Sequence, residues 1–232
     1  MSESLGLFPL GTTLLPGQRL PLHVFEPRYR DLLADLMSGA AGSAPGVIGR
    51  RGPRFGVVAI RVGHEVGAND VPQLHPVGCV AEVVEVQPHA DGSSDLLAVG
   101  RERFRLLGLD PSAGTSYLTG RVQWLEEPLT ATPAGLVDDV RNLFARYRAT
   151  LVAPGAEGAR GPVLPADPTV LSWAVAGALV LHAGERQRLL EDRDAAQRLA
   201  HLRRLLRREL VLLDAMPSLP ATDLARQPPD PR

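Results

Sequence analysis

The hydrophobic pattern changes its period along the chain, and this change constrains the fold more than any single motif. Before about residue 128, short apolar segments rich in β-branched residues alternate with turn residues such as Pro16-Gly17 and Asp91-Gly92. This pattern is typical of strands joined by tight turns. Strands are predicted at residues 7–15, 19–25, 55–62, 78–86, 96–99, 104–109 and 117–125.

One helix interrupts the predicted strands early, where Pro27 suits the first helical turn. Its apolar residues recur at helical spacing, at Tyr29, Leu32, Leu33 and Leu36. Many short strands joined by tight turns, with one early helix among them, predict a small closed or nearly closed β-barrel of about six strands. The Gly-, Ala- and Pro-rich residues 38–54 are expected to form a flexible loop.

After residue 128 the apolar residues follow a helical period. A first helix is predicted from Thr132 and Pro133, a second over residues 169–181, a short third over 184–191, and a last over 195–213 that is capped by Asp194. The second is apolar on nearly every face and is expected in the middle of a bundle. The sequence predicts an α+β chain with a β-rich barrel (1–128), a C-terminal helical bundle (129–215) and a disordered Pro-rich tail (216–232).

All 25 basic residues of the chain are arginine. Without lysine there is no Walker A phosphate loop, Schiff base or Ser-Lys dyad. Cys79 is the only cysteine, so neither an internal disulfide nor a cysteine-based zinc site is expected. The N-terminus does not read as a secretory signal, and no apolar run reaches the roughly 20 residues of a membrane span. We therefore expect a cytoplasmic protein that does not act on membranes.

Several blocks of residues together resemble one known family. They are Phe8-Pro9-Leu10-Gly11, Leu14-Leu15-Pro16-Gly17, the stretch 20–30, Val77-Gly78-Cys79-Val80-Ala81-Glu82-Val83, and Asp91-Gly92 followed by residues 96–105. Their order and spacing resemble those of the N-terminal substrate-binding domain of the Lon proteases. The helical half adds Leu164-Pro165-Ala166-Asp167-Pro168 and the stretch 186–191.

The resemblance implies a PUA-like β-barrel followed by a helical bundle, and recognition of unfolded or exposed polypeptide segments. Complete Lon proteases continue into an ATPase and a Ser-Lys peptidase domain, whereas this sequence ends at Arg232. We therefore expect a stand-alone, non-catalytic member of the family without cofactors, acting as an adaptor or holdase in protein quality control. Its expected partners are unfolded chains and a separate ATPase or protease.

The stretch from His23 to Arg30 holds the densest mixture of polar and aromatic residues. As a polypeptide-binding surface it would use Phe25 and Tyr29 for apolar contact, and Arg28 and Arg30 for carboxylates or carbonyls. Alternatively, Glu26 pairs internally with an arginine and holds the barrel against its helix. The groove where the barrel meets the bundle is a second expected part of the contact surface.

Two basic patches leave RNA binding as an alternative. They are the loop residues Arg50, Arg51 and Arg54 and the helical residues Arg203, Arg204, Arg207 and Arg208. The net charge of -1 and only 4% aromatic residues argue against nucleic acid, and a solvated helix face explains the second patch.

An unrecognised hydrolase is the third alternative, and the sequence offers no constellation for one. The six histidines show no metal-type spacing, so no metal site is predicted. Asp91 and Asp95 flank a turn and are explained by turn chemistry. Ser172 is expected to bond a carbonyl one turn back in its helix, and Cys79 to be a buried small hydrophobe.

Overall fold

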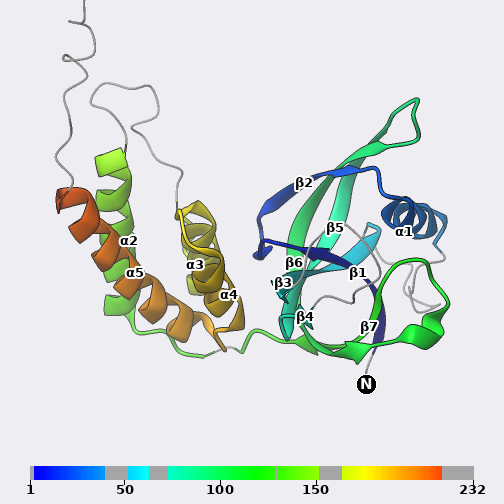
Figure 1. Cartoon of the computed structure of the whole chain (residues 1–232). Coiled ribbons are helices and arrows are strands. Elements are labelled where there is room, and N and C mark those ends of the chain that lie inside the picture. Colours follow the sequence, from blue (N-terminus) through cyan, green and yellow to red (C-terminus); the bar gives the residue numbers. More distant parts are fainter. Residues whose placement is uncertain (1–2, 40–51, 63–72, 129, 152–163, 216–232) are drawn as a thin grey trace, which may run out of the picture.

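The computed structural model describes residues 3–39, 52–62, 73–128, 130–151 and 164–215. Strands and one helix make up the first part, and helices the second. The first helix, α1 (Pro27–Ser38), lies on one side of the strands, and the C-terminal helices lie on the other (Figure 1). Most of the loop predicted at 38–54, the stretch 152–163 and the tail 216–232 fall outside the described residues.

Seven strands are found among the described residues. They are β1 (Glu3–Leu10), β2 (Arg19–Val24), β3 (Arg54–Val62), β4 (Gln73–Leu74), β5 (Val77–Pro88), β6 (Ser94–Leu109) and β7 (Thr119–Leu125). Five of them close a ring in the order β1-β7-β6-β5-β3, and β1 returns to β3 in the one parallel pairing of the described strands. The remaining strands attach in antiparallel fashion, β2 to β6 and β4 to β3. The predicted closed barrel is confirmed, with five strands in its ring.

Each of the five ring strands sends one fully buried apolar residue into a common cluster. The five are Leu7, Val58, Val80, Phe104 and Val122. Side chains of a strand alternate between its faces, so this cluster fills the inside of the barrel. Gly56 and Gly78 make room there, since a Cβ atom at either position would lie within 2.9 Å of Phe104 Cζ.

The opposite face of the barrel wall carries α1. Tyr29, Leu32, Leu33 and Leu36 are buried, as the helical spacing predicted. The Tyr29 ring stacks on Phe8 of β1, with ring centroids 3.9 Å apart and planes inclined by 12°. Stacking between a strand and the helix fixes how α1 lies against the barrel.

Strand β6 differs from the prediction, because residues 96–99 and 104–109 belong to one continuous strand of 16 residues. The residues between them, which look like an interruption, pair with the rest of the wall. A Cβ atom at Gly100 would lie 2.2 Å from the Leu15 carbonyl oxygen, so only glycine lets β6 pass the loop before β2 this closely. After β6 a short 3₁₀ turn (Pro111–Ala113) leads to β7.

Four helices complete the described chain: α2 (Ala134–Leu151), α3 (Pro168–Ala178), α4 (Ala183–Glu191) and α5 (Ala195–Ala215). The long helices α2 and α5 pack side by side (Figure 1). Asp167 and Asp194 cap α3 and α5 through backbone N–H groups of Val170 and Gln197, at 2.8 and 2.9 Å. Helix α3 was expected in the middle of the bundle, and five of its residues are buried, while Val170 in its first turn is 52% exposed. The division at residue 128 stays a prediction.

Candidate polypeptide-binding surface

A groove of about 590 Å³ lies between α1 and the turn that joins β5 to β6. Its volume is in the range of ligand clefts, roughly 300–1,000 Å³. We call it the α1–hairpin groove. Its lining combines apolar and charged side chains of α1 with small residues of the hairpin. The lining residues are Pro27, Arg30, Asp31, Leu33, Ala34, Met37, Val86, Gly92 and Ser94.

One exposed large apolar side chain lines this groove, and a second lies close to it in the sequence. Met37 of the lining is 58% exposed, and Phe25, two residues before the groove begins at Pro27, is 54% exposed. Large apolar side chains that stay in water leave free energy to be gained when a partner covers them. The groove can therefore hold apolar side chains, with Arg30 and Asp31 beside them to meet polar backbone groups.

Arg30 lies directly over the hairpin turn. Gly92 has a φ of +82°, and a Cβ atom there would lie 2.4 Å from Arg30 Nη2. Glycine thus serves both the left-handed turn and the approach of the guanidinium. The turn was correctly predicted from Asp91-Gly92, and Asp91 accepts hydrogen bonds from the N–H and hydroxyl of Ser93, at 2.9 and 2.7 Å.

The other predicted contact residues are engaged inside the chain. Tyr29 is only 5% exposed and belongs to the core, so its prediction as a contact residue is wrong, because it lies on the buried face of α1. Arg28 pairs with Glu26 at 2.9 Å and lies 4.6 Å from the centre of the Tyr29 ring. The internal pairing of Glu26 with an arginine, which was the alternative expectation, is present. Phe25 and Arg30 remain as the accessible members of the predicted set.

Buried polar groups fill part of the junction between barrel and bundle. Glu127 accepts hydrogen bonds from both Arg103 and Arg198, which are 4% and 0% exposed. Arg103 also donates to the carbonyl oxygens of Leu190 and Asp192, at 2.9 and 2.6 Å. These side chains fill the space around Glu127, and the expectation of a binding groove where the barrel meets the bundle stays a prediction.

An aromatic side chain covers the same junction. The Arg198 guanidinium lies 3.5 Å from the centre of the Trp173 ring and donates to the Ser172 hydroxyl at 2.7 Å. Ser172 in turn donates to the Thr169 carbonyl at 2.7 Å, as predicted. Sequence reasoning assigned no role to Arg103, Glu127, Trp173 or Arg198. Only the "RF" of the family-like block at residues 103–104 pointed to Arg103.

The predicted basic patches are largely offset by carboxylates. Arg54 lies 3.2 Å from Glu82 and 3.3 Å from Glu102. Burial raises the pKa of Glu82, but the Gly52 N–H and the guanidinium groups of Arg101 and Arg54 outweigh it and hold this pKa below its usual value. Arg50 and Arg51 lie outside the described residues.

The arginines of α5 follow the same rule. Arg203 and Arg207 share Asp139, at 3.1 and 3.9 Å, and Arg208 pairs with Glu185 and Glu209, while Arg204 is exposed. Because ion pairs within the chain neutralise most of these arginines, the described part of the helix presents no continuous basic strip. This is the solvated helix face that was expected, and it weakens the case for nucleic acid.

Two further expectations concern reactive groups and membranes. Cys79 is fully buried, and burial raises the pKa of its thiol to about 12, which fits an inert small hydrophobe. Among the described residues, none of the helices has the length and apolar character needed to cross a bilayer.

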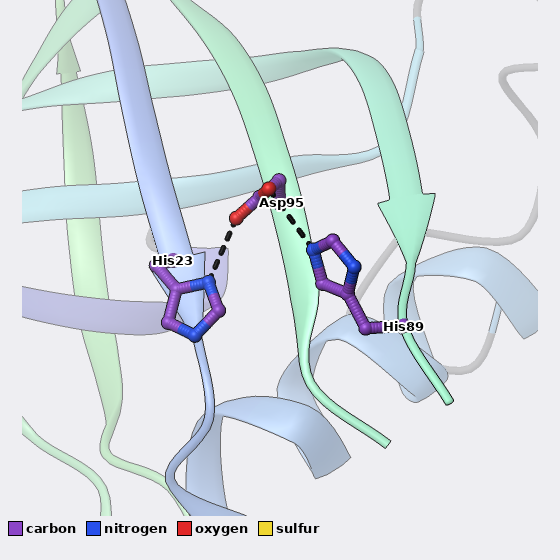
Figure 2. A group of neighbouring side chains, drawn as sticks. All are labelled: His23, His89 and Asp95. Atoms are coloured by element: carbon purple, nitrogen blue, oxygen red, sulfur yellow. Dashed lines mark hydrogen bonds and ion pairs between the residues drawn. The ribbon is translucent and has the colours of Figure 1, made fainter. Parts of the chain in front are cut away.

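Three polar residues that sequence reasoning treated separately come together near the hairpin. Asp95 was assigned to turn chemistry, but its carboxylate lies between His23 and His89 (Figure 2). Hydrogen bonds from His23 and then His89 lower the pKa of Asp95. His23 and Asp95 are 72 residues apart, and only the pairing of β2 with β6 makes them neighbours. No local spacing could have revealed this group.

Comparison with known proteins gives a matching family model and two related proteases. Residues 4–208 match the model of the ATP-dependent protease La (LON) substrate-binding domain. The chain is 26% identical over 217 residues to Lon protease 2 of Syntrophobacter fumaroxidans, covering 92% of this chain and 25% of that protein. It is 28% identical over 147 residues to Lon protease 1 of Hydrogenovibrio crunogenus, covering 62% and 18%. The chain thus spans a quarter or less of these relatives.

Solved structures agree with this match. A Lon N-terminal domain protein from Xanthomonas campestris superposes with a TM-score of 0.59 at 26% identity, covering 92% of this chain and 99% of that one. The N-terminal domain of the Mycobacterium avium complex Lon protease superposes with a TM-score of 0.58 at 17% identity, covering 88% and 98%. The second likeness concerns the fold alone.

Proposed function

We propose, because this chain belongs to the ATP-dependent protease La (LON) substrate-binding domain family, that it recognises exposed polypeptide segments through the α1–hairpin groove. The observation that carries the proposal is a groove lined by the exposed Met37 and the buried Leu33, with the exposed Phe25 two residues before the lining residue Pro27. Unfolded chains expose the apolar side chains that such a groove accommodates. Folded proteins keep most of theirs inside.

The charges around the groove support a partner of mixed composition. Arg30 and Asp31 are both exposed and contribute one charge of each sign. Such a pair can bind the carbonyl and N–H groups of an extended backbone without selecting for net charge. Recognition of this kind suits a module that accepts many different unfolded segments.

We infer that the module serves as an adaptor or holdase. Binding an exposed segment would hold an unfolded chain and present it to a separate ATPase or protease. The catalytic steps of the longer relatives would then belong to that partner. RNA binding is less well supported, since carboxylates lie close to the described arginines of both basic patches.

The test is a binding titration with a labelled peptide library derived from casein, measured by fluorescence anisotropy. Phe25→Ala and Met37→Ala should each weaken binding by about tenfold, since each removes apolar area that the peptide would cover. Both side chains are exposed, so the free energy of unfolding should change by no more than about 0.5 kcal/mol. Circular dichroism and urea denaturation check this point.

Matched controls come from the bundle. Val180 and Val211 are 82% and 66% exposed and belong to the part of the chain after the barrel. Val180→Ala and Val211→Ala should bind peptides like the wild type. Failure of the wild type to bind any peptide of the library would overturn the proposal. So would unchanged affinity in both groove variants.

A further inference from the structure

We propose that His23, His89 and Asp95 form a binding site for one divalent transition-metal ion of the zinc class (Figure 2). The proposal does not depend on the polypeptide-binding function, because it rests on a separate group of side chains. Each of the three residues offers one ligand atom, and these atoms all lie within 4.8 Å of one another. Among the described residues, no other group of at least three His, Cys, Asp or Glu side chains meets this condition.

Two of the residues lie on the paired strands β2 and β6, and His89 is the first residue after β5, in the turn of the β5–β6 hairpin. His23 on β2 directly opposes Asp95 on β6, so their side chains leave the same face of the sheet. On the other side of β6, Gln87 of β5 opposes Asp95, and His89 follows two residues later in the hairpin turn, where its ring reaches the Asp95 carboxylate. Side chains held by paired strands keep their spacing better than side chains on loops, which favours the His23–Asp95 pair, and the short β5–β6 hairpin keeps His89 beside it.

The two histidine nitrogens already lie close to the Asp95 carboxylate. His23 Nδ1 lies 2.7 Å from Asp95 Oδ1, and His89 Nε2 lies 2.9 Å from Asp95 Oδ2. In a tetrahedral zinc site with bonds of about 2.0–2.1 Å, ligand atoms are about 3.4 Å apart. Opening the two contacts by less than an ångström would bring both near that separation. The contacts are made by the two different oxygens of Asp95, so binding one ion also requires the ligand atoms, which all lie within 4.8 Å of one another, to turn toward a common point.

The donor set selects the class of metal. Two imidazole nitrogens with one carboxylate oxygen suit Zn²⁺ and its neighbours Co²⁺, Ni²⁺ and Cu²⁺, whereas Mg²⁺ and Ca²⁺ prefer oxygen ligands throughout. The side chains of His23, Asp95 and His89 are 56%, 54% and 37% exposed. A metal ion can therefore enter from solvent, and water can complete its coordination.

A bound ion would tie β2 to the β5–β6 hairpin. Gly92 and Ser94 of this hairpin line the α1–hairpin groove, and Ser94 directly precedes Asp95. The metal would thus hold one wall of the groove in place. Because the metal binds only the folded arrangement of three separate segments, it should also raise the melting temperature.

The experiment uses the full chain without a polyhistidine tag, freed of metal with a chelator and titrated with ZnCl₂ in a calorimeter. One saturable site is expected. His89→Ala and Asp95→Asn should each weaken zinc binding by more than about tenfold, since loss of even an outer hydrogen-bond partner costs 10–100-fold in many sites. With Co²⁺, the wild type should develop visible absorption bands that both variants lose.

The controls are other histidines of the chain. His201 pairs with a single carboxylate, Asp192, at 3.1 Å, and His182 is exposed at the start of α4. His201→Ala and His182→Ala should keep the wild-type zinc affinity. The absence of saturable binding by the wild type would overturn the proposal. Unchanged affinity in both His89→Ala and Asp95→Asn would do so as well, leaving the three residues as a hydrogen-bonded surface group only.

Discussion

Arginine side chains are buried on one side of the barrel wall and exposed on the other. At the junction with the bundle, Arg103 and Arg198 are buried around Glu127 and covered by Trp173. At the α1–hairpin groove, Arg30 is exposed beside the exposed Met37. Buried charges hold parts of a protein in one arrangement, because they are costly unless every partner is in place. Exposed apolar and charged groups remain available to a partner. The comparison indicates one side that fixes the architecture and one whose exposed groups fit the proposed binding of polypeptides.

The largest expected effect on stability comes from a substitution that disrupts the junction between barrel and bundle. Arg198→Met removes a fully buried guanidinium that contacts Glu127, Ser172 and Trp173. Removing one member of a buried ion pair costs about 3–5 kcal/mol, and the remaining Arg103–Glu127 contact at 2.8 Å places this variant at the lower end. Urea denaturation measures the change in the free energy of unfolding.

The matched control lies on the same helix. Arg204 is exposed on α5, and Arg204→Met should change stability by no more than about 0.5 kcal/mol. The comparison of the two sides also predicts that Arg198→Met, where still folded, binds peptides with wild-type affinity. Equal stability of the two variants would show that the junction does not hold the architecture.

A smaller effect is expected from Gly92→Ala at the edge of the groove. The positive φ of Gly92 disfavours a side chain, and its Cβ atom would displace the Arg30 guanidinium. We expect a loss of about 1–2 kcal/mol in stability, together with weaker peptide binding because Arg30 must move. Gly114→Ala is the matched control. It has a φ of +68° but no heavy atom within 4 Å of the added Cβ, so it should lose stability without losing peptide affinity.

Features of the fold that depend on residues close together in the sequence could be predicted, whereas features that depend on distant residues could not. The helix at Pro27 and the cap at Asp194 were predicted correctly, because local periodicity and side-chain chemistry determine them. Strand β4 was missed, since two residues carry no periodic signal. Strand β6 was divided in two, because its polar middle reads as a turn.

The contacts that position functional groups were harder to predict than the elements. Tyr29 was assigned both to the buried helix face and to the binding surface, and packing on Phe8 decides for the first. Arg198 looks like any other helical arginine until Glu127 and Trp173 are brought to it from distant segments. The grouping of His23 with Asp95 likewise depends on the register of β2 on β6.

The smallest expected effect on stability, and the sharpest test of the comparison, is Arg30→Ala. Arg30 is exposed, so the free energy of unfolding should change by no more than about 0.5 kcal/mol, in contrast to the buried Arg198. Peptide binding should nevertheless weaken severalfold, most of all for peptides rich in Asp and Glu. This difference should shrink as salt rises from about 0.05 to 0.5 M, since exposed charges are screened. Arg204→Ala, which removes an exposed arginine from the bundle, should leave the same titrations unchanged. If both variants weaken binding equally, peptides are attracted by overall charge and the groove has no special part in binding.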